Sequence, residues 1–232
     1  MSDEPRPSIA IIGGTGHLGA ALAGRLAQAG YAVTVGSRDP ARAAAAAAQL
    51  CAARGVRLGH GTNVEAAAAA EVVILAVPFA SQAATLGEIA PHVAGKIVVD
   101  TTVPLVPPKV MRVQLPPEGS AAVAAQRRLG AAVRVVSAFH NVAAHKLATD
   151  EVVDCDVLVF GDERAARDVV VALARACGLR GLHGGALANS AAAEALTSVL
   201  IFLNKTYGVD GAGLRITGSL GVPAAAAGAR PA

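Results

Sequence analysis

Short apolar runs alternate along the chain with longer segments in which apolar and polar residues are mixed. The runs at 72–77 and 97–100 lack the two-residue alternation of a half-exposed strand, and such unbroken runs are typical of parallel strands covered on both faces. Strands are predicted at 9–12, 32–36, 55–59, 72–77, 97–100, 133–139, 156–160 and, briefly, within 178–185. Helices are predicted at 20–29, 41–54, 65–70, 81–90, 121–129, 163–177 and 189–207. The alternation indicates an α/β fold with a doubly wound sheet.

A glycine-rich turn follows the first predicted strand and precedes the first predicted helix. Its pattern is Gly14-x-Gly16-x-x-Gly19, in which Gly14 permits a tight turn and Gly16 lets the backbone approach a pyrophosphate. Gly19 allows the helix to pack closely on the strand. The unpaired N–H groups at the start of that helix would hold the pyrophosphate. The spacing therefore predicts a Rossmann-type NAD(P)-binding domain.

The residues after the second predicted strand indicate which dinucleotide binds. A site that prefers NAD places Asp or Glu here to hold the ribose hydroxyls. This chain has Ser37 and Arg38, with Arg42 one turn into the next helix, while Asp39 comes one position late. Two guanidinium groups and a hydroxyl suit a dianionic 2′-phosphate. We therefore expect NADP(H), the alternative being that both arginines form a solvated helix start.

Ligands of doubly wound sheets bind beyond the carboxyl ends of the strands. Val77-Pro78 and Val103-Pro104 follow two such strands and would flank the nicotinamide, although proline also ends strands for backbone reasons. His140 follows a third strand. It could hydrogen-bond a carbonyl group or pass a proton during hydride transfer, which makes it the candidate catalytic residue. The alternative is a capping histidine whose ring is satisfied by the backbone.

The chain divides into three predicted parts. Residues 8–138 form the NADP-binding domain, 139–217 a smaller C-terminal domain for the acceptor site or dimerisation, and 218–232 a disordered tail. The proline-rich connection at 105–119 is a long loop that would cover the site. In the last predicted helix Leu196, Val199, Leu200 and Leu203 form one stripe, which would face the core or a second subunit of a homodimer.

Composition narrows the class of protein further. The 232 residues carry a net charge of +3, and the basic residues are scattered, so nucleic acid is not an expected partner. Three widely spaced cysteines form neither a disulfide framework nor a zinc site, and no metal is expected. The N-terminus lacks the apolar core of a signal peptide, and Asn189 and Glu194 interrupt the most apolar segment. A cytoplasmic location away from membranes is expected.

Several motifs taken together resemble the NADPH:coenzyme F420 oxidoreductase family, the NADPH-dependent F420 reductases. The likeness spans about residues 8–217, and Gly-Gly-Thr-Gly-x-Leu-Gly joined to Val-Gly-Ser-Arg is its most specific part. Cytoplasmic domains of membrane ferric reductases share these motifs, but no membrane segment is expected here. The resembling segments are 10–19, 35–38, 76–78, 136–140, 189–190 and 196–197.

The resemblance implies hydride transfer between NADPH and C5 of a deazaflavin, coenzyme F420, with little demand on the protein beyond placing two rings together. It implies that Thr15 contacts the 2′-phosphate together with the serine and arginines named above. It also implies that His17 and Leu18 lie with Gly16 along the pyrophosphate. Val77-Pro78 would lie beside the nicotinamide. The residues implied on the acceptor side are His140, Val142 and Thr197.

The acceptor half of the resemblance has departures. Alanines stand after Asn189-Ser190 where family members carry an arginine and a serine, and Ala143 replaces a common proline. Lost donors would weaken acceptor binding by about 1–3 kcal/mol each. Two alternatives therefore stay open. One is an NADPH-dependent reductase of a pterin, flavin, imine or small ketone; the other is a non-catalytic NADPH-binding redox sensor.

Overall fold

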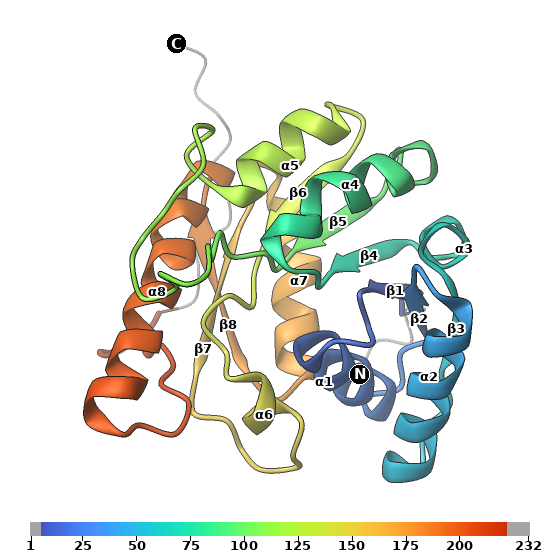
Figure 1. Ribbon diagram of the computed structural model, residues 1–232, viewed down its shortest axis with the longest axis horizontal. Helices are drawn as coiled ribbons and strands as arrows, with labels where there is room; N and C mark the ends of the chain where they lie inside the picture. Colours follow the sequence, from blue (N-terminus) through green and yellow to red (C-terminus); the bar gives the residue numbers. More distant parts are fainter. Residues whose placement is uncertain (1–5, 222–232) are drawn as a thin grey trace.

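The computed structural model describes residues 6–221, which form one eight-stranded sheet flanked by helices (Figure 1). The strand order is β3-β2-β1-β4-β5-β6-β7-β8. The strands are β1 (Ile9–Ile12), β2 (Val33–Ser37), β3 (Gly59–Thr62), β4 (Val72–Leu75), β5 (Ile97–Asp100), β6 (Arg134–Ser137), β7 (Asp156–Phe160) and β8 (Arg180–Gly185). From β1 the chain adds β2 and β3 on one side of the sheet and then β4 and the later strands on the other side, so the predicted doubly wound fold is confirmed.

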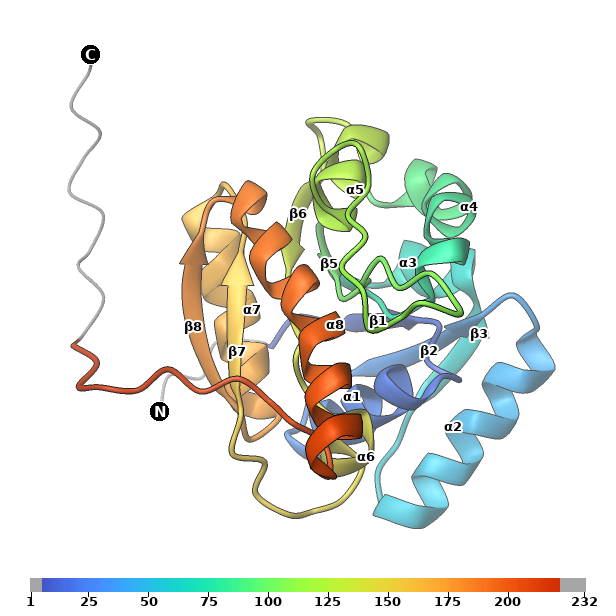
Figure 2. The same ribbon diagram turned by 60° about the vertical axis from the view of Figure 1, so that its left-hand side comes forward.

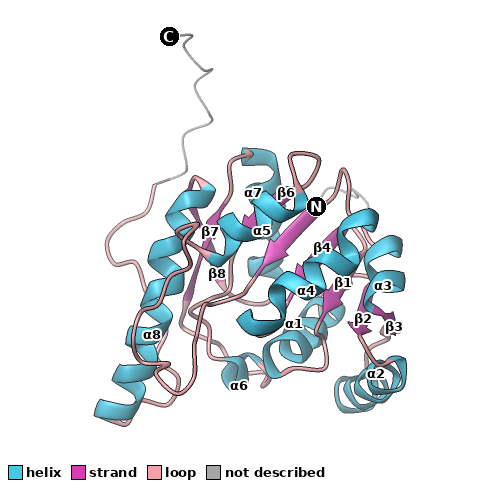
Figure 3. Ribbon diagram, turned by 45° about the horizontal axis from the view of Figure 1, so that its top comes forward, coloured by secondary structure: helices cyan, strands magenta, loops and turns pink. Residues whose placement is uncertain are grey.

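Helices lie on both sides of the sheet (Figure 3). They are α1 (His17–Gln28), α2 (Pro40–Arg54), α3 (Asn63–Ala69), α4 (Phe79–Ile89), α5 (Ala121–Leu129), α6 (Ala144–Leu147), α7 (Arg164–Ala176) and α8 (Ser190–Tyr207), with short 3₁₀ turns η1 (Ala90–His92) and η2 (Leu187–Asn189). Successive residues of a strand point to opposite faces. Ile9 and Ile11 join the core under α1 and α7, whereas Ala10 and Ile12 join the core under α3, α4 and α5.

The sheet is parallel except at one junction. Strands β1 to β6 are parallel to their neighbours, β6 and β7 pair antiparallel through Ser137 and Phe160, and β7 and β8 are parallel again. The core nevertheless continues across this junction, because Val157 and Val159 of β7 belong to the same apolar cluster as β1. The C-terminal strands thus extend the sheet that holds the glycine-rich turn.

Helix α8 lies against α5 and β7, beside the long connection between β5 and α5 (Figure 2). Ser198 donates a hydrogen bond to the carbonyl oxygen of Arg112 in that connection. The segment Leu187–Tyr207 is long and apolar enough to span a membrane by length and composition, and one third of its most apolar window is buried. Its acid Glu194 is 1% exposed and contacts α5.

Two arginines hold the loop that precedes β7. Arg25 of α1 donates to the carbonyl oxygens of Leu147, Thr149 and Glu151. Arg54 of α2 donates to the carbonyl oxygen of Ala148 and pairs with the Asp150 carboxylate at 3.1 Å. Helices α1 and α2 are therefore bound to the loop that leads into the C-terminal strands β7 and β8.

Some predicted boundaries are wrong. The third strand lies at Gly59–Thr62 rather than 55–59, because Gly55 ends α2 in a left-handed conformation and the chain pairs with β2 only later. Helices α1 and α4 begin earlier than predicted, and β4 and β6 are shorter at their ends. The irregular connection at 105–119 is confirmed. Within the predicted tail, residues 222–232 lie outside the described residues.

Candidate functional site

The glycine-rich turn between β1 and α1 is packed so tightly that it excludes side chains at most positions. Gly13 has a φ of +79°, so the turn also needs a glycine at the position before Gly14. A Cβ on Gly14 would lie 2.9 Å from Val35, and one on Gly19 would lie 2.6 Å from the Gly13 oxygen. The predicted helix–strand packing role of Gly19 is therefore visible. A Cβ on Gly16 would be less crowded, because its nearest neighbour, the Gly13 oxygen, would lie at 3.3 Å.

Gly16 is also the residue that precedes α1. No side chain caps this helix, so its first N–H groups face outward from the turn. A bound anion can accept their hydrogen bonds, and the helix dipole favours negative charge at this end. The turn therefore fits a pyrophosphate by backbone geometry.

The end of β2 presents the polar groups predicted for the 2′-phosphate. Ser37 is 9% exposed, and its oxygen accepts a hydrogen bond from the N–H of Asp39, which leaves its hydroxyl proton available. Arg38 and Arg42 are exposed and make no ion pair within residues 6–221. Asp39 instead caps α2, accepting from the N–H groups of Ala41 and Arg42. The one acid near this strand end is thus used by the helix.

A cleft of about 490 Å³ joins these groups. It runs from the glycine-rich turn across the ends of β2 and β4, which are the carboxyl ends at which doubly wound sheets bind ligands. Seven of the residues predicted to bind the cofactor meet in it. Its lining residues are Gly13, Thr15, Gly16, Ser37, Arg38, Asp39, Arg42, Asn63, Ala76, Val77, Pro78, Ser81 and Thr85.

Asn63 lines this cleft but is not among the residues predicted to bind the cofactor. Thr62 is the cap of α3, and it forms a reciprocal capping box with Glu65. Asn63 is 3% exposed, and its side-chain oxygen has no hydrogen-bond partner among the described residues. The sequence did not reveal it, because strand β3, which places Asn63 at the ligand-binding edge of the sheet, has no apolar pattern.

The remaining predicted cofactor residues lie outside the lining of this cleft. His17 is exposed at the start of α1 and lines a neighbouring cavity together with His145 of α6. Leu18 is half-buried and packs on the core. Val142 is 9% exposed and is part of the core cluster. Their predicted contacts with the cofactor or the acceptor stay predictions.

His140 is buried beyond the end of β6. The chain reaches it through Phe139, the one non-glycine residue with positive φ (+67°) in the described part of the chain. The His140 Nε2 atom lies 2.9 Å from the Ser137 hydroxyl, and burial lowers the pKa of the ring to about 4 despite a hydrogen bond with the Asp100 backbone. The ring is therefore neutral at pH 7. These contacts favour the capping interpretation, and a catalytic role for His140 stays a prediction.

Thr197 ties α8 to the segment after β6. Its hydroxyl lies within hydrogen-bond distance of the carbonyl oxygens of His140 (3.1 Å) and Ala193 (3.3 Å), and it accepts from the Asn141 amide. Asn141 also donates to Ala193. The structure therefore brings the Thr197 hydroxyl to the backbone of His140, while their predicted location on the acceptor side stays a prediction.

Two buried carboxyl groups lie beneath this region. Asp100, at the end of β5, accepts hydrogen bonds from Gln82 and from the N–H of Thr102, and burial raises its pKa to about 6. Glu194 of α8 accepts from the N–H groups of Ala121 and Ala122 at the start of α5. Burial, with a smaller contribution from the nearby Asp100 charge, raises the pKa of Glu194 to about 7. Sequence reasoning missed this pair.

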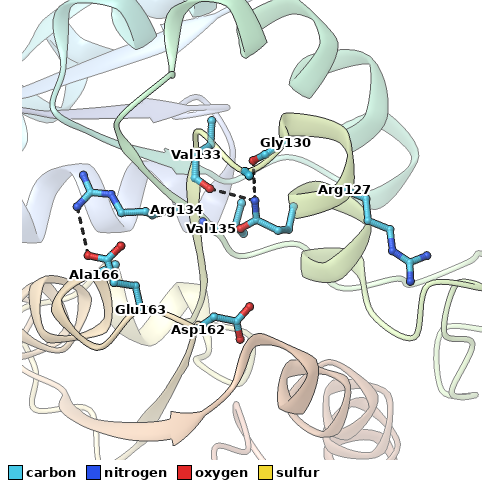
Figure 4. Close-up of a pocket in the computed structure, with 10 residues that line it drawn as sticks. Arg127, Gly130, Val133, Arg134, Val135, Asp162, Glu163 and Ala166 are labelled. Carbon is cyan, nitrogen blue, oxygen red and sulfur yellow. Dashed lines mark hydrogen bonds and ion pairs between the residues drawn. The ribbon is translucent and has the colours of Figure 1, made fainter. Parts of the chain in front are cut away.

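A separate cavity of about 450 Å³ lies between the end of α5, the start of β6 and the start of α7 (Figure 4). Arg134 points toward Glu163 across it, with a nitrogen–oxygen distance of 3.7 Å. Gln126 closes its wall by donating to the carbonyl oxygens of Gly130 and Val133. This cavity is at the amino end of β6, the opposite edge from the glycine-rich turn, so it is not part of the nucleotide cleft.

Comparison with known proteins places this site in a family. The family described as "NADP oxidoreductase coenzyme F420-dependent" matches residues 8–104, which include the whole cleft. An F420-dependent NADP reductase from Methanothermobacter thermautotrophicus is 41% identical over 218 residues, which is 90% of this chain and 94% of the relative. The chain belongs to the F420-dependent NADP reductase family.

Other members of the family give the same result. The F420-dependent NADP reductase from Methanocaldococcus jannaschii is 40% identical over 220 residues, 90% of this chain and 97% of the relative. A crystal structure from Arthrobacter sp. FB24, provisionally assigned as an F420-dependent NADP reductase, superposes with a TM-score of 0.79 at 29% identity. It covers 91% of this chain and 99% of that one. The family resemblance seen in the motifs is thus confirmed.

Proposed function

We propose that this protein is an oxidoreductase that transfers a hydride between NADPH and the deazaflavin coenzyme F420. The observation that supports it most directly is the cleft in which the glycine-rich turn, Ser37, Arg38 and Arg42 converge. When bound, the nicotinamide supplies the hydride from C4, and C5 of the deazaflavin accepts it while a proton comes from solvent. Family membership supports F420 as the acceptor, because the relatives named above carry that activity in their names.

The protein residues would bind and orient the nucleotide. Backbone N–H groups at the start of α1 would hold the pyrophosphate, and the two guanidinium groups with the Ser37 hydroxyl would hold the 2′-phosphate. Val77 and Pro78 would lie beside the nicotinamide. We propose further that residues 8–138 form the nucleotide-binding domain and that residues 139–217 form the acceptor and dimerisation part.

Binding of NADPH and NADH to an Arg38→Ala variant tests the nucleotide assignment. Hydrogen bonds to charged groups contribute about 1.5–3 kcal/mol, so NADPH affinity should fall about 10- to 100-fold while NADH affinity stays nearly unchanged. Arg57→Ala, which removes an exposed arginine near the amino end of β3, is the matched control and should leave both affinities unchanged. Equal losses for NADPH and NADH in Arg38→Ala would contradict the assignment.

The acceptor is tested by mixing the protein with NADPH and F420 and following the visible absorbance of F420. Loss of that band with stoichiometric NADPH oxidation is the expected result. NADPH oxidation only with a flavin, pterin, imine or ketone would replace F420 by that acceptor class. Tight NADPH binding without turnover on any of these acceptors would contradict the proposed reaction and favour the sensor.

We also propose that the protein is a cytoplasmic homodimer that pairs through α8 and the adjoining connection. The apolar stripe predicted on α8 has a buried and an exposed part. Leu200 is 8% exposed and faces the core, whereas Val199 is 42% exposed. Phe202, at 49%, is exposed beside it. The connection held against α8 through Ser198 exposes further large apolar side chains at Val106, Met111, Val113 and Leu115.

Light scattering tests the homodimer against the chain mass of 23.0 kDa. The wild type should have twice that mass, and Phe202→Asp should shift the equilibrium to the monomer without loss of helical circular dichroism. Leu220→Asp, at an exposed apolar position beyond α8, is the control and should stay dimeric. A wild-type monomer at micromolar concentration would contradict the proposal.

A further inference from the structure

The cleft contains one hydrogen-bond acceptor that the fold itself leaves unused. Asn63 lines the cleft, and its side-chain oxygen is buried and has no partner among residues 6–221. Burying an amide oxygen without a hydrogen bond costs about 1–3 kcal/mol. Most buried polar groups are therefore paired, and an unpaired one in a ligand cleft points to a ligand donor.

The orientation of this amide is defined by its other end. The Asn63 Nδ2 atom donates to the Glu88 carboxylate of α4 at 3.2 Å. An ionised carboxylate accepts hydrogen bonds and cannot donate them, so it pairs with the NH₂ group and not with the oxygen. The oxygen is consequently directed away from Glu88, and it belongs to a residue that lines the cleft.

The location of Asn63 indicates which part of the nucleotide it meets. Thr62, the preceding residue, is the register partner of Ser37 at the end of β2. A Cβ built on Gly36 would lie 3.4 Å from the Asn63 Cα, so the two strand ends are in close contact. Asn63 therefore lies at the adenosine end of the cleft, beside the group assigned to the 2′-phosphate. A phosphate has no proton to donate at neutral pH, so it is not the partner.

We infer that Asn63 is a recognition residue for the adenosine half of the nucleotide and accepts a hydrogen bond from a neutral donor. That half offers two such donors, the 6-amino group of adenine and the 3′-hydroxyl of its ribose. Glu88 acts through Asn63 as a positioning residue, because it holds the amide oxygen toward the donor. This inference rests on the proposed NADP(H) function and assigns a base or sugar contact that the phosphate-binding residues do not make.

Calorimetric binding of adenosine 2′,5′-bisphosphate to Asn63→Ala tests it. A neutral hydrogen bond predicts an affinity about 3- to 10-fold lower than wild type. Two analogues identify the donor. With inosine 2′,5′-bisphosphate the loss should vanish if the 6-amino group is the donor, and with 3′-deoxyadenosine 2′,5′-bisphosphate it should vanish if the 3′-hydroxyl is the donor. An unchanged affinity, or an equal loss with all three probes, would overturn the inference.

Two further variants keep the test decisive. Glu88→Gln changes an exposed side chain and permits the Asn63 amide to rotate, so it should lower the affinity for adenosine 2′,5′-bisphosphate about 3-fold. Wild-type affinity in this variant would overturn the inference even if Asn63→Ala fails to fold. Asn204→Ala removes an amide oxygen that is satisfied by Ala212 and should bind like wild type. If wild-type protein itself does not bind the probe, the proposed nucleotide function fails instead.

Discussion

Replacing Glu194 by glutamine should change how the stability of the protein depends on pH. The carboxyl group has an ordinary pKa of 4.5 and a pKa of about 7 in the folded chain, chiefly because it is buried. Between these values the folded chain keeps a proton that the unfolded chain has lost. The free energy of unfolding therefore falls as pH rises from about 4.5 to 7.

The size of this effect follows from the same two pKa values. One pKa unit corresponds to about 1.4 kcal/mol, so Glu194 removes about 3 kcal/mol of stability over the whole interval and about 1 kcal/mol between pH 6 and 8. Between pH 6 and 8 most of the change comes from Glu194, because Asp100, whose folded pKa is about 6, is already half ionised at the start of this range. In Glu194→Gln the single amide oxygen can replace only one of the two carboxylate oxygens that accept from Ala121 and Ala122. The lost hydrogen bond lowers stability by the same amount at every pH, whereas the pH-dependent loss disappears because no proton is released.

Guanidinium unfolding at several pH values between 5 and 8 measures the difference. Circular dichroism is the suitable signal because the chain has no tryptophan. The wild type should lose stability toward pH 8, and Glu194→Gln should lose about 1 kcal/mol less between pH 6 and 8. Glu151→Gln, at an exposed position, should follow the wild type. Parallel curves for wild type and Glu194→Gln would refute the assignment of a buried, neutral-prone carboxyl group.

Three other substitutions have defined outcomes. Gly19→Ala should lower both the melting temperature and NADPH affinity, because its Cβ would lie 2.6 Å from the Gly13 oxygen; wild-type values for both would contradict the tight packing. Gly87→Ala, in the interior of α4 with nothing within 4 Å, should raise the free energy of unfolding by up to about 1 kcal/mol. Arg180→Ala should lower it in urea unfolding, because buried Asp156 loses a two-pronged ion pair; a wild-type unfolding midpoint would contradict this.

Local patterns were sufficient for most of the fold and for many of the residues that meet in the cleft beside the glycine-rich turn. The strands at Ile97–Asp100 and Asp156–Phe160 and the helix Ala121–Leu129 agree with prediction residue for residue, because a charged or glycine residue flanks one end of each. The glycine-rich turn and the residues after β2 were predictable because their spacing along the chain sets their geometry. Pairing at the sheet edge was not: β3 is Gly-His-Gly-Thr, which has no apolar signal.

Contacts between distant segments account for what the sequence did not reveal. Glu194 and Asp100 are 94 positions apart, and only the packing of α8 on α5 brings them near each other. The burial of His140 depends on β5, which supplies the Asp100 backbone, and on Ser137 of its own strand. The unpaired oxygen of Asn63 depends on Glu88 in another helix. No periodicity in one segment can report such relations.

The hydrogen bonds from Arg25 and Arg54 to the loop at 147–151 limit where the protein can be truncated. A fragment ending at residue 138 would keep every glycine and arginine of the nucleotide cleft, yet both helices would lose the carbonyl partners that fix these two side chains. It would also expose Leu22 and Leu26 to water where α7 now covers their cluster. Such a fragment should aggregate rather than serve as a minimal cofactor-binding module, so useful chimeras must exchange the whole chain.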